Sequence, residues 1–377
     1  MDEPLHIAIA GRALDLPFGG VKTAVLAILR ELAQIGAPHR FTLYTPDARH
    51  AIAGMDHVTL RAPHKALWDH AVLPLRLAHQ RPDVVWFPHN VISLGWRGPS
   101  VVTIYDLAYF PVPQIPAREY APLDAAYMRL AIPPSLRSAS RVMAISRWTA
   151  DEAVHWCGTD PAKMAVIPLA VDPLFRPIVP ELARSIVEPL IGDGPFFLYA
   201  GGLSPRKNIR MLVESFGAVA AYIPHRLVIT AGILSGETSI ADLIERYQLH
   251  GRVLQIGEVG GEQLRALYNT ADALVYPSLY EGFGLPPLEA MACGCLAICS
   301  NATSLPEVVG DAALLLDPHD GAVWSDALLR CANDDALRHE LRAARLRRAA
   351  QFSWARTARA LLGLLENAVR ERDVCLS

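Results

Sequence analysis

Short apolar runs alternate with amphipathic segments along almost the whole of this 377-residue chain. The runs have no polar face, which favours strands that are covered by helices on both sides. Such strands, separated by helices, predict parallel sheets of the doubly wound α/β class. The expected strands are Leu5–Ala10, Phe41–Thr45, Val84–Phe87, Val101–Tyr105, Val142–Ile145, Phe196–Ala200, Leu227–Ala231, Val253–Ile256, Ala273–Tyr276 and Leu296–Cys299. The clearest helices are expected at Val21–Ile35, Arg147–Trp156, Asn208–Ala221 and Ser353–Asn367.

The alternation breaks in one proline-rich segment, residues 168–195. Its prolines are Pro168, Pro173, Pro177, Pro180, Pro189 and Pro195. This density of proline predicts a linker between two domains. We expect an N-terminal domain over residues 1–180, a second domain over residues 190–352, and a final helix in residues 353–377 that crosses back to the first domain. Ligands of such folds bind at the carboxyl ends of parallel strands, so a cleft between the domains is the expected site.

Composition and motif searches exclude several kinds of protein. A net charge of −3 gives no basic field for nucleic acid. The acidic start Met1-Asp2-Glu3 is unlike a signal peptide, and no apolar run is long enough to span a membrane, so we expect a cytoplasmic protein. The six cysteines are expected to be buried free thiols, because Cys293, Cys295 and Cys299 lack the spacing of a zinc site.

Phosphate-binding motifs of the common nucleotide enzymes are missing from the sequence. No G-x-G-x-x-G follows a predicted strand, and there is no G-x-x-x-x-G-K-[ST] loop. A nicotinamide dehydrogenase or a P-loop NTPase is therefore disfavoured. No Asp-x-Asp pair is present to chelate a metal beside a diphosphate. We expect neither a cofactor nor a metal.

Two adjacent cations follow the predicted strand at residues 196–200. Gly201 and Gly202 allow close backbone approach, and Arg206 and Lys207 stand just before a predicted helix. A helix N-terminus attracts anions, so this segment predicts a metal-free diphosphate site. The alternative is a glycine turn with two solvated cations.

Two glutamates follow the predicted strand at residues 273–276. Glu281 lies in a glycine-containing loop, and Glu289 lies about one turn into the next helix. A carboxylate accepts hydrogen bonds from paired hydroxyls, which suits a sugar or a ribose. The alternative is an acid at a helix N-terminus and an exposed glutamate, but Arg206 and Lys207 strengthen the functional interpretation.

The spacing Glu281-x₇-Glu289 resembles the E-x₇-E motif of retaining glycosyltransferases of family 4. The segments 278–286, 289–294, 205–208 and 352–354 are similar to other signatures of that family, in the same order. The resemblance implies a GT-B fold, with two Rossmann-like domains facing a central cleft. It also implies transfer of a hexosyl unit from a nucleotide sugar, with retention of the anomeric configuration.

The resemblance also implies a role for each matching residue. Arg206 and Lys207 would bind the donor diphosphate, Glu289 would hold the ribose hydroxyls, and the catalytic Glu281 would contact the transferred sugar. The implied donor-binding backbone positions are Gly282, Phe283, Gly284 and Leu285 after the strand, Gly19 and Gly20 in an N-terminal glycine-rich loop, and Gly257 beside the base.

The sequence departs from the family pattern at two positions. Gly202 stands where many members have an arginine, so a phosphate contact would rest on Arg206 alone. Tyr105-Asp106 stands where many have a His-Asp pair. Asp106 remains the second catalytic candidate, while Tyr105 can donate a hydrogen bond but carries no charge at neutral pH. His89 could supply an imidazole instead, although a solvated loop histidine is the simpler interpretation.

The segment Pro205-Arg206-Lys207-Asn208 is similar to a mannosyltransferase subgroup, so GDP-mannose is the leading donor and UDP-sugars are the alternatives. A glycan or a lipid-linked intermediate is the expected acceptor. Two other functions stay open: a nucleotide-sugar epimerase or phosphorylase of the same fold, and a non-catalytic module that binds sugar nucleotides. A phosphorylase would need a pyridoxal lysine.

Basic and apolar residues mix in two segments of the first domain. Residues 65–81 combine Trp68 with His70, Arg76 and His79, and residues 118–147 add several arginines, beginning with Arg118. This pattern predicts peripheral contact with anionic lipid, on the inner face of the membrane. The alternative is a set of ordinary solvated helix faces.

Overall fold

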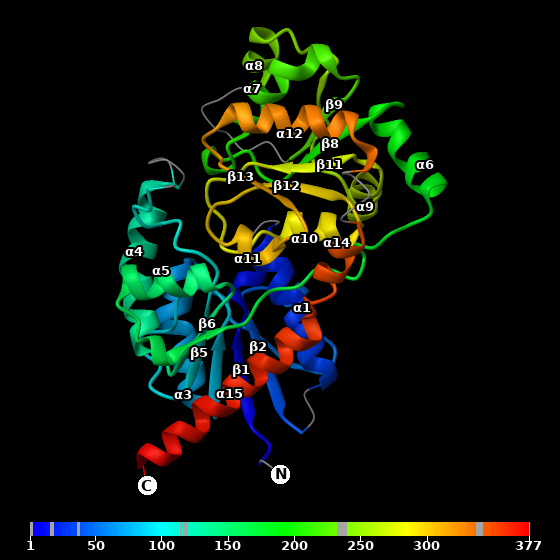
Figure 1. Cartoon of the computed structure of the whole chain (residues 1–377). Coiled ribbons are helices and arrows are strands. Elements are labelled where there is room, and N and C mark those ends of the chain that lie inside the picture. The colour runs from blue at the N-terminus through cyan, green and yellow to red at the C-terminus, as the bar shows by residue number, and fades with distance from the viewer. Residues whose placement is uncertain are drawn as a thin grey trace. The chain divides into compact units, whose positions relative to one another are not determined.

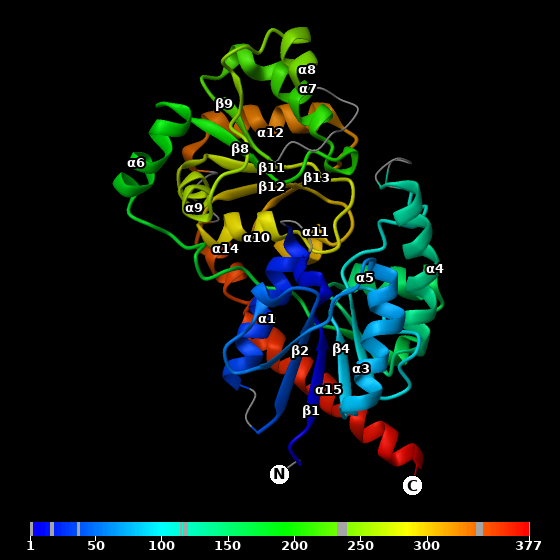
Figure 2. The same cartoon turned by 180° about the vertical axis from the view of Figure 1, so that it is seen from behind.

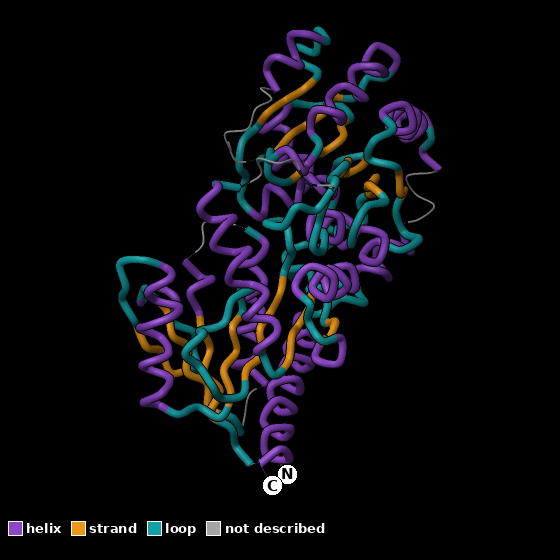
Figure 3. Tube along the Cα trace, turned by 90° about the vertical axis from the view of Figure 1, so that its left-hand side faces the viewer, coloured by secondary structure: helices purple, strands orange, loops and turns teal. Residues whose placement is uncertain are grey.

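The computed structural model describes residues 3–15, 19–35, 38–113, 115, 120–231, 240–336 and 342–376. The chain divides into two compact units. The first comprises Met1–Phe110, Tyr120–Ala170 and Ser353–Ser377, and the second comprises Pro111–Glu119 and Val171–Phe352. Figure 3 shows strands lying between helices in each unit, which is the predicted α/β class.

The first unit is built on a parallel sheet of seven described strands in the order β3-β2-β1-β4-β5-β6-β7. The strands are β1 (His6–Ala10), β2 (Arg40–Thr45), β3 (Asp56–Thr59), β4 (Val84–Phe87), β5 (Ser100–Ile104), β6 (Arg141–Ala144) and β7 (Met164–Val166). In register, Ile7 of β1 pairs with Phe41 on one side and with Val84 on the other. The strand order reverses between the central strands β1 and β4, so the carboxyl ends of these two strands mark the switch point of a Rossmann-like sheet.

Helices cover both faces of this sheet, and the longer ones bury an apolar stripe against it. They are α1 (Gly20–Ile35), α2 (Lys65–Leu67), α3 (Leu73–Gln80), α4 (Pro122–Ser138), α5 (Arg147–Cys157) and α15 (Trp354–Leu376). In α1 the buried stripe includes Ala24, Ile28 and Leu32. The last helix, α15, packs on α1 and crosses the sheet beside β4, β5 and β6 (Figure 1).

The second unit repeats this plan with described strands in the order β10-β9-β8-β11-β12-β13. They are β8 (Phe196–Ala200), β9 (Arg226–Thr230), β10 (Val253–Gln255), β11 (Ala273–Tyr276), β12 (Leu296–Ser300) and β13 (Leu314–Leu316). All are parallel. Here the chain order reverses between β8 and β11.

Helices of the second unit also lie on both faces of its sheet. They are α6 (Pro180–Ile191), α7 (Ile209–Val219), α8 (Ile240–Arg246), α9 (Gly261–Thr270), α10 (Leu285–Ala292), α11 (Leu305–Val309), α12 (Gly321–Asn333) and α14 (Arg342–Ala349). Helices α7 and α12 pack together on one side, and α10 lies on the other beside β12 and α14 (Figure 2).

The linker interpretation of residues 168–195 was wrong in its second half, because α6 occupies Pro180–Ile191. Pro180 stands in the first turn, where a proline removes no helical hydrogen bond. Ala183, Val187 and Ile191 then form a buried stripe that recurs every four residues. Tertiary burial of this stripe outweighs the cost of Pro189 near the end of the helix.

Strand predictions were confirmed for β4, β8 and β11 and were displaced by about one residue elsewhere, as fraying ends lead one to expect. Three strands were missed: β3, β7 and β13. Each lies at an edge of its sheet and is only partly buried. Strand β3 has no apolar run, and the apolar strands β7 and β13 are only 3 residues long, which is too short to be distinguished from the neighbouring loops. The predicted C-terminal helix is longer than expected and reaches Leu376.

The thiols that the structure describes are free and buried, as predicted: Cys157, Cys293, Cys295, Cys299 and Cys331. Burial raises the pKa of the Cys157 and Cys295 thiols to about 12, so both are protonated at neutral pH. Within the described residues, no helix combines the length and the apolar character needed to cross a membrane.

Candidate active site

The loops that follow β8 and β11 bring the predicted charged residues together. These strands are neighbours at the point where the strand order reverses, so their carboxyl ends leave a crevice between diverging loops. A short 3₁₀ turn, Pro205–Lys207, follows β8, and Glu281 lies in the loop after β11. Arg206 and Lys207 therefore reach Glu281, although Lys207 and Glu281 lie 74 residues apart in the sequence.

The core of this switch-point site is a buried triad of Lys207, Glu281 and Tyr276. The Lys207 ammonium donates to Glu281 Oε1 at 2.5 Å and to the Tyr276 hydroxyl at 2.8 Å. The Tyr276 hydroxyl in turn donates to Glu281 Oε1 at 2.8 Å. The side chains of Lys207 and Glu281 are each 10% exposed. All three polar heads are thus engaged with one another.

The two cations keep Glu281 ionised. Burial by itself would raise the pKa of this carboxyl, but Lys207 and Arg206 outweigh burial and hold the pKa at about 2. Arg206 Nη1 lies 3.5 Å from Glu281 Oε2. The site therefore holds two cations and one carboxylate, which leaves a net positive charge for an anionic ligand.

Backbone contacts tie the two loops into one unit. Arg206 Nη1 donates to the carbonyl of Tyr280 at 2.8 Å, and the N–H of Leu279 donates to the carbonyl of Arg206 at the same distance. Asn208, at φ 58°, turns the chain into α7, and its side-chain amide donates to the carbonyl of Pro318 at 2.8 Å. Arginine side chain and loop backbone thus fix the position of the Glu281 loop.

The segment Gly282–Leu285 leads directly into α10. The hydroxyl of Ser304 donates to the carbonyls of Glu281 and Phe283, both at 2.9 Å. Gly284 has φ +109°, and a Cβ there would approach Leu305 Cδ2 to 2.5 Å, so only glycine fits. The tight turn predicted here is confirmed, while ligand binding by these backbone groups stays a prediction.

Glu289 lies in α10, close to the position that the sequence predicts. The hydroxyl of Tyr268 donates to Glu289 Oε2 at 3.1 Å. Burial, only partly offset by this hydrogen bond, raises the pKa of Glu289 to about 7. The two glutamates of the motif therefore differ in charge state near neutrality: Glu281 is ionised and Glu289 is poised to titrate.

Gly257 lies just beyond β10, where its carbonyl accepts a hydrogen bond from Thr230 Oγ1 at 2.9 Å. It has φ +71°, and no atom lies within 4 Å of the place where a Cβ would stand. The backbone of Gly257 is therefore not covered on this side by other described atoms, which would let it line a pocket. Its role beside the base stays a prediction.

The other predicted residues gather in the first unit, around a cavity of about 470 Å³ at the carboxyl ends of β1, β4 and β5. Its lining includes Gly19, Gly20, His89, Tyr105 and Asp106. Gly20 opens α1, and the Asp106 carboxylate accepts from the N–H of Ala108 at 3.2 Å. The Tyr105 hydroxyl and His89 Nδ1 are buried atoms without a hydrogen-bond partner in the described structure.

The interpretation of His89 as a solvated loop residue was wrong. Its side chain is half-buried at the wall of the cavity with Nδ1 buried, and desolvation, with Arg12 and Lys65 nearby, lowers its pKa to about 3. His89 is therefore neutral. It offers a hydrogen-bonding nitrogen to the cavity and no positive charge at physiological pH.

Sequence reasoning missed the tyrosines that support the site. Tyr276 ends β11, and Tyr199 lies beside it near the end of β8. The two rings are stacked, with 6.1 Å between their centres. Tyr268 supports Glu289 from α9. The available signal was position: side chains at the carboxyl ends of strands flanking a switch point are the ones that face a ligand.

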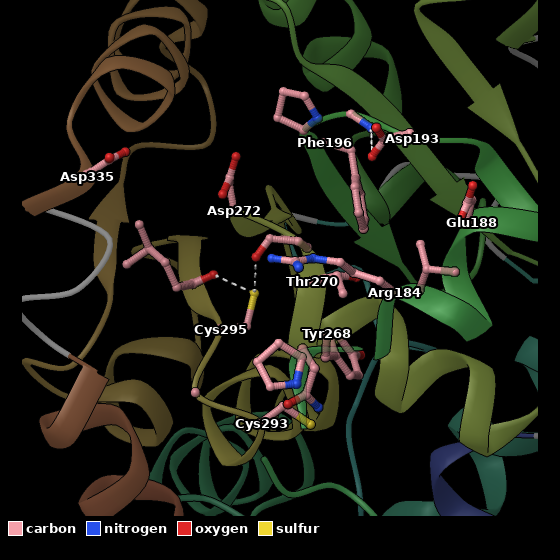
Figure 4. A pocket seen from close by; sticks show the side chains of 18 of the residues that line it. Arg184, Glu188, Asp193, Phe196, Tyr268, Thr270, Asp272, Cys293, Cys295 and Asp335 are labelled. Atoms are coloured by element: carbon pink, nitrogen blue, oxygen red, sulfur yellow. Dashed lines mark hydrogen bonds between the residues drawn. The ribbon is translucent and has the colours of Figure 1, made fainter. Parts of the chain in front are cut away.

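A second cavity, of about 750 Å³, lies at the opposite edge of the second unit's sheet (Figure 4). It is lined by residues at or just before the starts of the strands, such as Phe196, Asp272 and Cys295, and by Arg184 and Glu188 of α6. Arg206, Lys207 and Glu281 do not line it. Its link to the switch-point site is Tyr268, which lines this cavity while its hydroxyl reaches Glu289.

Comparison with known proteins agrees with this geometry. Residues 184–348 match the family described as glycosyl transferases group 1, and residues 18–174 match glycosyltransferase family 4. O-antigen chain mannosyltransferase B of Escherichia coli is 36% identical over 294 residues, which cover 74% of this chain and 75% of that protein. The serotype-specific mannosyltransferase WbdA of Escherichia coli is 34% identical over 226 residues, 58% of this chain and 28% of WbdA.

Solved structures share the fold over nearly the whole chain. Sucrose-phosphate synthase of Thermosynechococcus elongatus superposes with a TM-score of 0.78 at 21% identity, covering 96% of this chain and 98% of that one. The Anabaena protein HepE, solved in complex with UDP-glucose, superposes with a TM-score of 0.77 at 17% identity, covering 96% of this chain and 100% of HepE. With these similarities and the arrangement of Lys207, Glu281 and Glu289 in hand, the chain belongs to glycosyltransferase family 4 and is a GT-B enzyme that transfers a sugar from a nucleotide sugar.

Proposed function

We propose that this enzyme transfers a mannosyl unit from GDP-mannose to a hydroxyl of a glycan or lipid-linked glycan, with retention of the anomeric configuration. The observation that carries the transfer chemistry is the cluster at the switch point, where Lys207 and Glu281 are buried and Arg206 is half-buried, with Glu289 on the helix that follows. The choice of mannose rests on the similarity to O-antigen chain mannosyltransferase B and to the serotype-specific mannosyltransferase WbdA.

The cluster suits departure of a nucleoside diphosphate. Negative charge develops on the diphosphate as its bond to the sugar breaks, and Lys207 and Arg206 are fixed cations that stabilise it. Backbone N–H groups of Gly282 to Leu285, at the start of α10, add positive potential on the same side. Glu281, held ionised by its neighbours, faces the positive character that grows on the anomeric carbon.

Retention requires the acceptor hydroxyl to attack from the face that the diphosphate leaves. In this proposal an oxygen of the departing diphosphate takes the acceptor proton. Asp106 is the second catalytic candidate. It belongs to the first unit, where it lines the cavity together with Tyr105, Tyr109, Tyr120 and Tyr127. Tyrosine faces and a carboxylate are groups that bind a sugar ring, so we assign the acceptor glycan to this cavity.

Donor identity is tested by thermal unfolding with a panel of nucleotide sugars. A ligand present at 100 times its Kd adds about 2.7 kcal/mol of stability, so a true donor raises Tm clearly. We expect GDP-mannose to give the largest shift, above UDP-glucose and UDP-N-acetylglucosamine, and GDP to be released when a mannose-containing glycan is added. A larger shift with a UDP-sugar would overturn the choice of GDP-mannose.

The same incubation separates the remaining alternatives. An epimerase would convert the sugar nucleotide without any acceptor, and a phosphorylase would show the absorbance of bound pyridoxal phosphate. A non-catalytic module would bind the sugar nucleotide and release no GDP. We expect none of these three results.

Activity is expected to survive EDTA. The two cations beside Glu281 supply the charge that a divalent metal would otherwise supply to the diphosphate. Initial rates of GDP release with and without the chelator are the measurement. Loss of activity that Mg²⁺ or Mn²⁺ restores would contradict the proposal that no metal is needed.

Changing Glu289 to Gln is expected to weaken donor binding by about 10- to 100-fold, because charge-assisted hydrogen bonds to the ribose are lost. Turnover at saturating donor should change little. Since the pKa of Glu289 is raised to about 7, donor affinity of the unaltered enzyme should increase as pH rises from 6 to 8. Titration of donor across this range is the measurement, and a variant that keeps the same pH dependence would contradict the assignment.

We also propose that the first unit contacts an anionic membrane surface on its cytoplasmic side. Leu123 and Leu130 of α4 are 87% and 78% exposed and lie seven residues apart, on one face of the helix. Leu75 of α3 is 73% exposed. The prediction that Trp68 contributes to a lipid-facing surface was wrong, because its ring is buried and its indole N–H donates to the carbonyl of Leu60. Arg118 lies outside the described residues.

Sedimentation with vesicles tests this contact. The protein is expected to pellet with vesicles that contain anionic phosphatidylglycerol and to be released by high salt. Leu123→Ser with Leu130→Ser should abolish pelleting, whereas Leu182→Ser, at an exposed position in the second unit, should leave it unchanged. Equal behaviour of the two variants would refute the assignment to α4.

A further inference from the structure

Tyr276 occupies a place that the transfer chemistry described above does not use. Its ring is fully buried at the end of β11, and its hydroxyl is the one neutral partner in the triad: it accepts from Lys207 and donates to Glu281, each at 2.8 Å. The Lys207 ammonium also stands 5.2 Å from the centre of the Tyr276 ring. Both the hydroxyl and the ring of Tyr276 therefore face the charged pair.

The position of the Tyr276 ring is set by its neighbours. It stacks on Tyr199 of β8, with 16° between the ring planes, and the Tyr199 hydroxyl donates to the carbonyl of Gly202 at 2.6 Å. A Cβ on Gly201 would stand 3.2 Å from the Tyr199 hydroxyl and 3.6 Å from Tyr276 Cε2. The two rings are thus held by adjacent strands and by the glycine turn above them.

Once a donor binds, Lys207 interacts with two anions, the Glu281 carboxylate and the donor diphosphate. In the free protein its ammonium bonds the Glu281 carboxylate, and in the proposed reaction it also neutralises the donor diphosphate. An ammonium has three N–H donors, and two of them already point to Glu281 and Tyr276. Any movement of Lys207 toward the diphosphate weakens its hold on Glu281 at the moment when that carboxylate is needed.

We propose that Tyr276 is a positioning residue that keeps the Glu281 carboxylate oriented and ionised when the donor diphosphate draws Lys207 toward itself. This inference rests on the proposed function, because it presumes that Lys207 contacts a donor diphosphate. The Tyr276 hydroxyl suits this task because it stays a neutral donor: burial, with Glu281 close by, raises its pKa well above the usual value.

Every charged or titratable group that faces Glu281 in the described structure bears on this role. Lys207 and Arg206 approach from the turn after β8. Tyr276 lies at the end of β11, while Tyr199 of β8 and Cys299 of β12 interact with Glu281 electrostatically. Burial raises the pKa of both Tyr199 and Cys299, so they stay neutral and leave the two cations and the Tyr276 hydroxyl to hold the carboxylate.

The test is Tyr276→Phe, which removes the hydroxyl and keeps the ring. GDP release from GDP-mannose is measured against donor concentration from pH 8 down to pH 3, because the Glu281 pKa of about 2 places the acid limb of kcat at the low end of that range. We expect kcat to fall about 10- to 100-fold with donor KM changed less than about threefold, because a hydrogen bond to an ionised group acts on the carboxylate more than on donor binding. The acid limb of kcat should move up by about one to two pH units.

Two controls separate this role from a structural one. Tyr44→Phe, in the first unit, removes a buried hydroxyl that has no hydrogen-bond partner among the described residues, and it should leave both kcat and the acid limb unchanged. Acid unfolding of the free protein is compared for the same variants. Glu281 contributes stability above its unfolded pKa of about 4.3 and loses it as pH falls through its folded pKa, so Tyr276→Phe should lose stability at a higher pH than Tyr44→Phe.

The outcomes are distinct. An unchanged acid limb with unchanged kcat in Tyr276→Phe would overturn the inference, and so would a rise in donor KM equal to the fall in kcat, since that would place the hydroxyl on the donor. If the unaltered enzyme releases no nucleotide from any sugar nucleotide, the proposed function fails, while the acid-unfolding comparison still decides whether Tyr276 holds Glu281 ionised.

Discussion

Glu281→Gln is expected to lower turnover by about 100- to 1000-fold while donor affinity changes less than about threefold. The amide keeps the shape of the side chain and can still accept from Lys207, but it carries no charge to balance the positive character of the anomeric carbon. An interaction that matters mainly in the transition state appears in kcat and not in KM. Steady-state kinetics with donor titration is the measurement.

Glu214→Gln is the matched control for this change. Glu214 lies in the same unit and forms a helical ion pair with Arg210 at 3.0 Å, away from the triad. We expect it to retain normal kinetics, because exposed ion pairs contribute little. If Glu281→Gln only raised the donor KM at full turnover, the roles given to Glu281 and Glu289 would be reversed.

Lys207→Met should be the variant with the largest combined loss. Methionine fills much of the same space but offers no charge to the diphosphate, so donor affinity should fall by about 10- to 150-fold. It also leaves the Glu281 carboxylate buried without its closest cation. Removing one partner of a buried pair costs about 3–5 kcal/mol of unfolding free energy, and the remaining Arg206 places the expected loss at the lower end.

The pH dependence of that loss is a further check. Glu281 has a folded pKa of about 2, below its unfolded value of about 4.3. Its ionised form therefore stabilises the fold fully above about pH 4.3, and this stabilisation is lost as the pH falls toward about 2. In Lys207→Met the folded pKa rises, and the stability defect should be largest near pH 7 and shrink as the carboxyl is protonated toward pH 4. Denaturant unfolding at several pH values measures it.

The double variant Lys207→Met with Glu281→Gln closes the cycle. Without either charge the buried site has no unpaired ion, so much of the lost stability should return while activity stays low. A double variant as unstable as Lys207→Met alone would show that the instability has another origin, such as poor packing of methionine against Tyr276.

Much of the fold could be predicted because local pattern reflects burial. Strands β4, β8 and β11 lie at the centres of their sheets, where both faces are covered, so their residues form continuous apolar runs. Helix α6 could not be recognised in the same way. Its prolines indicate a loop, and only the packing of its buried stripe against the second unit makes a helix there stable.

The charged residues of the site were also visible in the sequence. Arg206 and Lys207 precede a helix, and Glu281 and Glu289 flank the start of another, so residue type and spacing were enough to indicate a diphosphate and a sugar or ribose. The resemblance to family 4 added the nucleotide sugar. The state of those residues was not visible. Nothing local distinguishes Glu281, with a pKa near 2, from Glu289, with a pKa near 7.

By itself the sequence determined the α/β class, the central strands and the chemical types of residue at the site, because each depends on neighbours within a few positions along the chain. Tertiary structure alone decided that Lys207 meets Glu281 and Tyr276, since their contact depends on β8 and β11 being adjacent where the strand order reverses. It also decided the charges of the two glutamates, because a pKa responds to burial and to cations brought close by the fold, and neither is a property of sequence spacing.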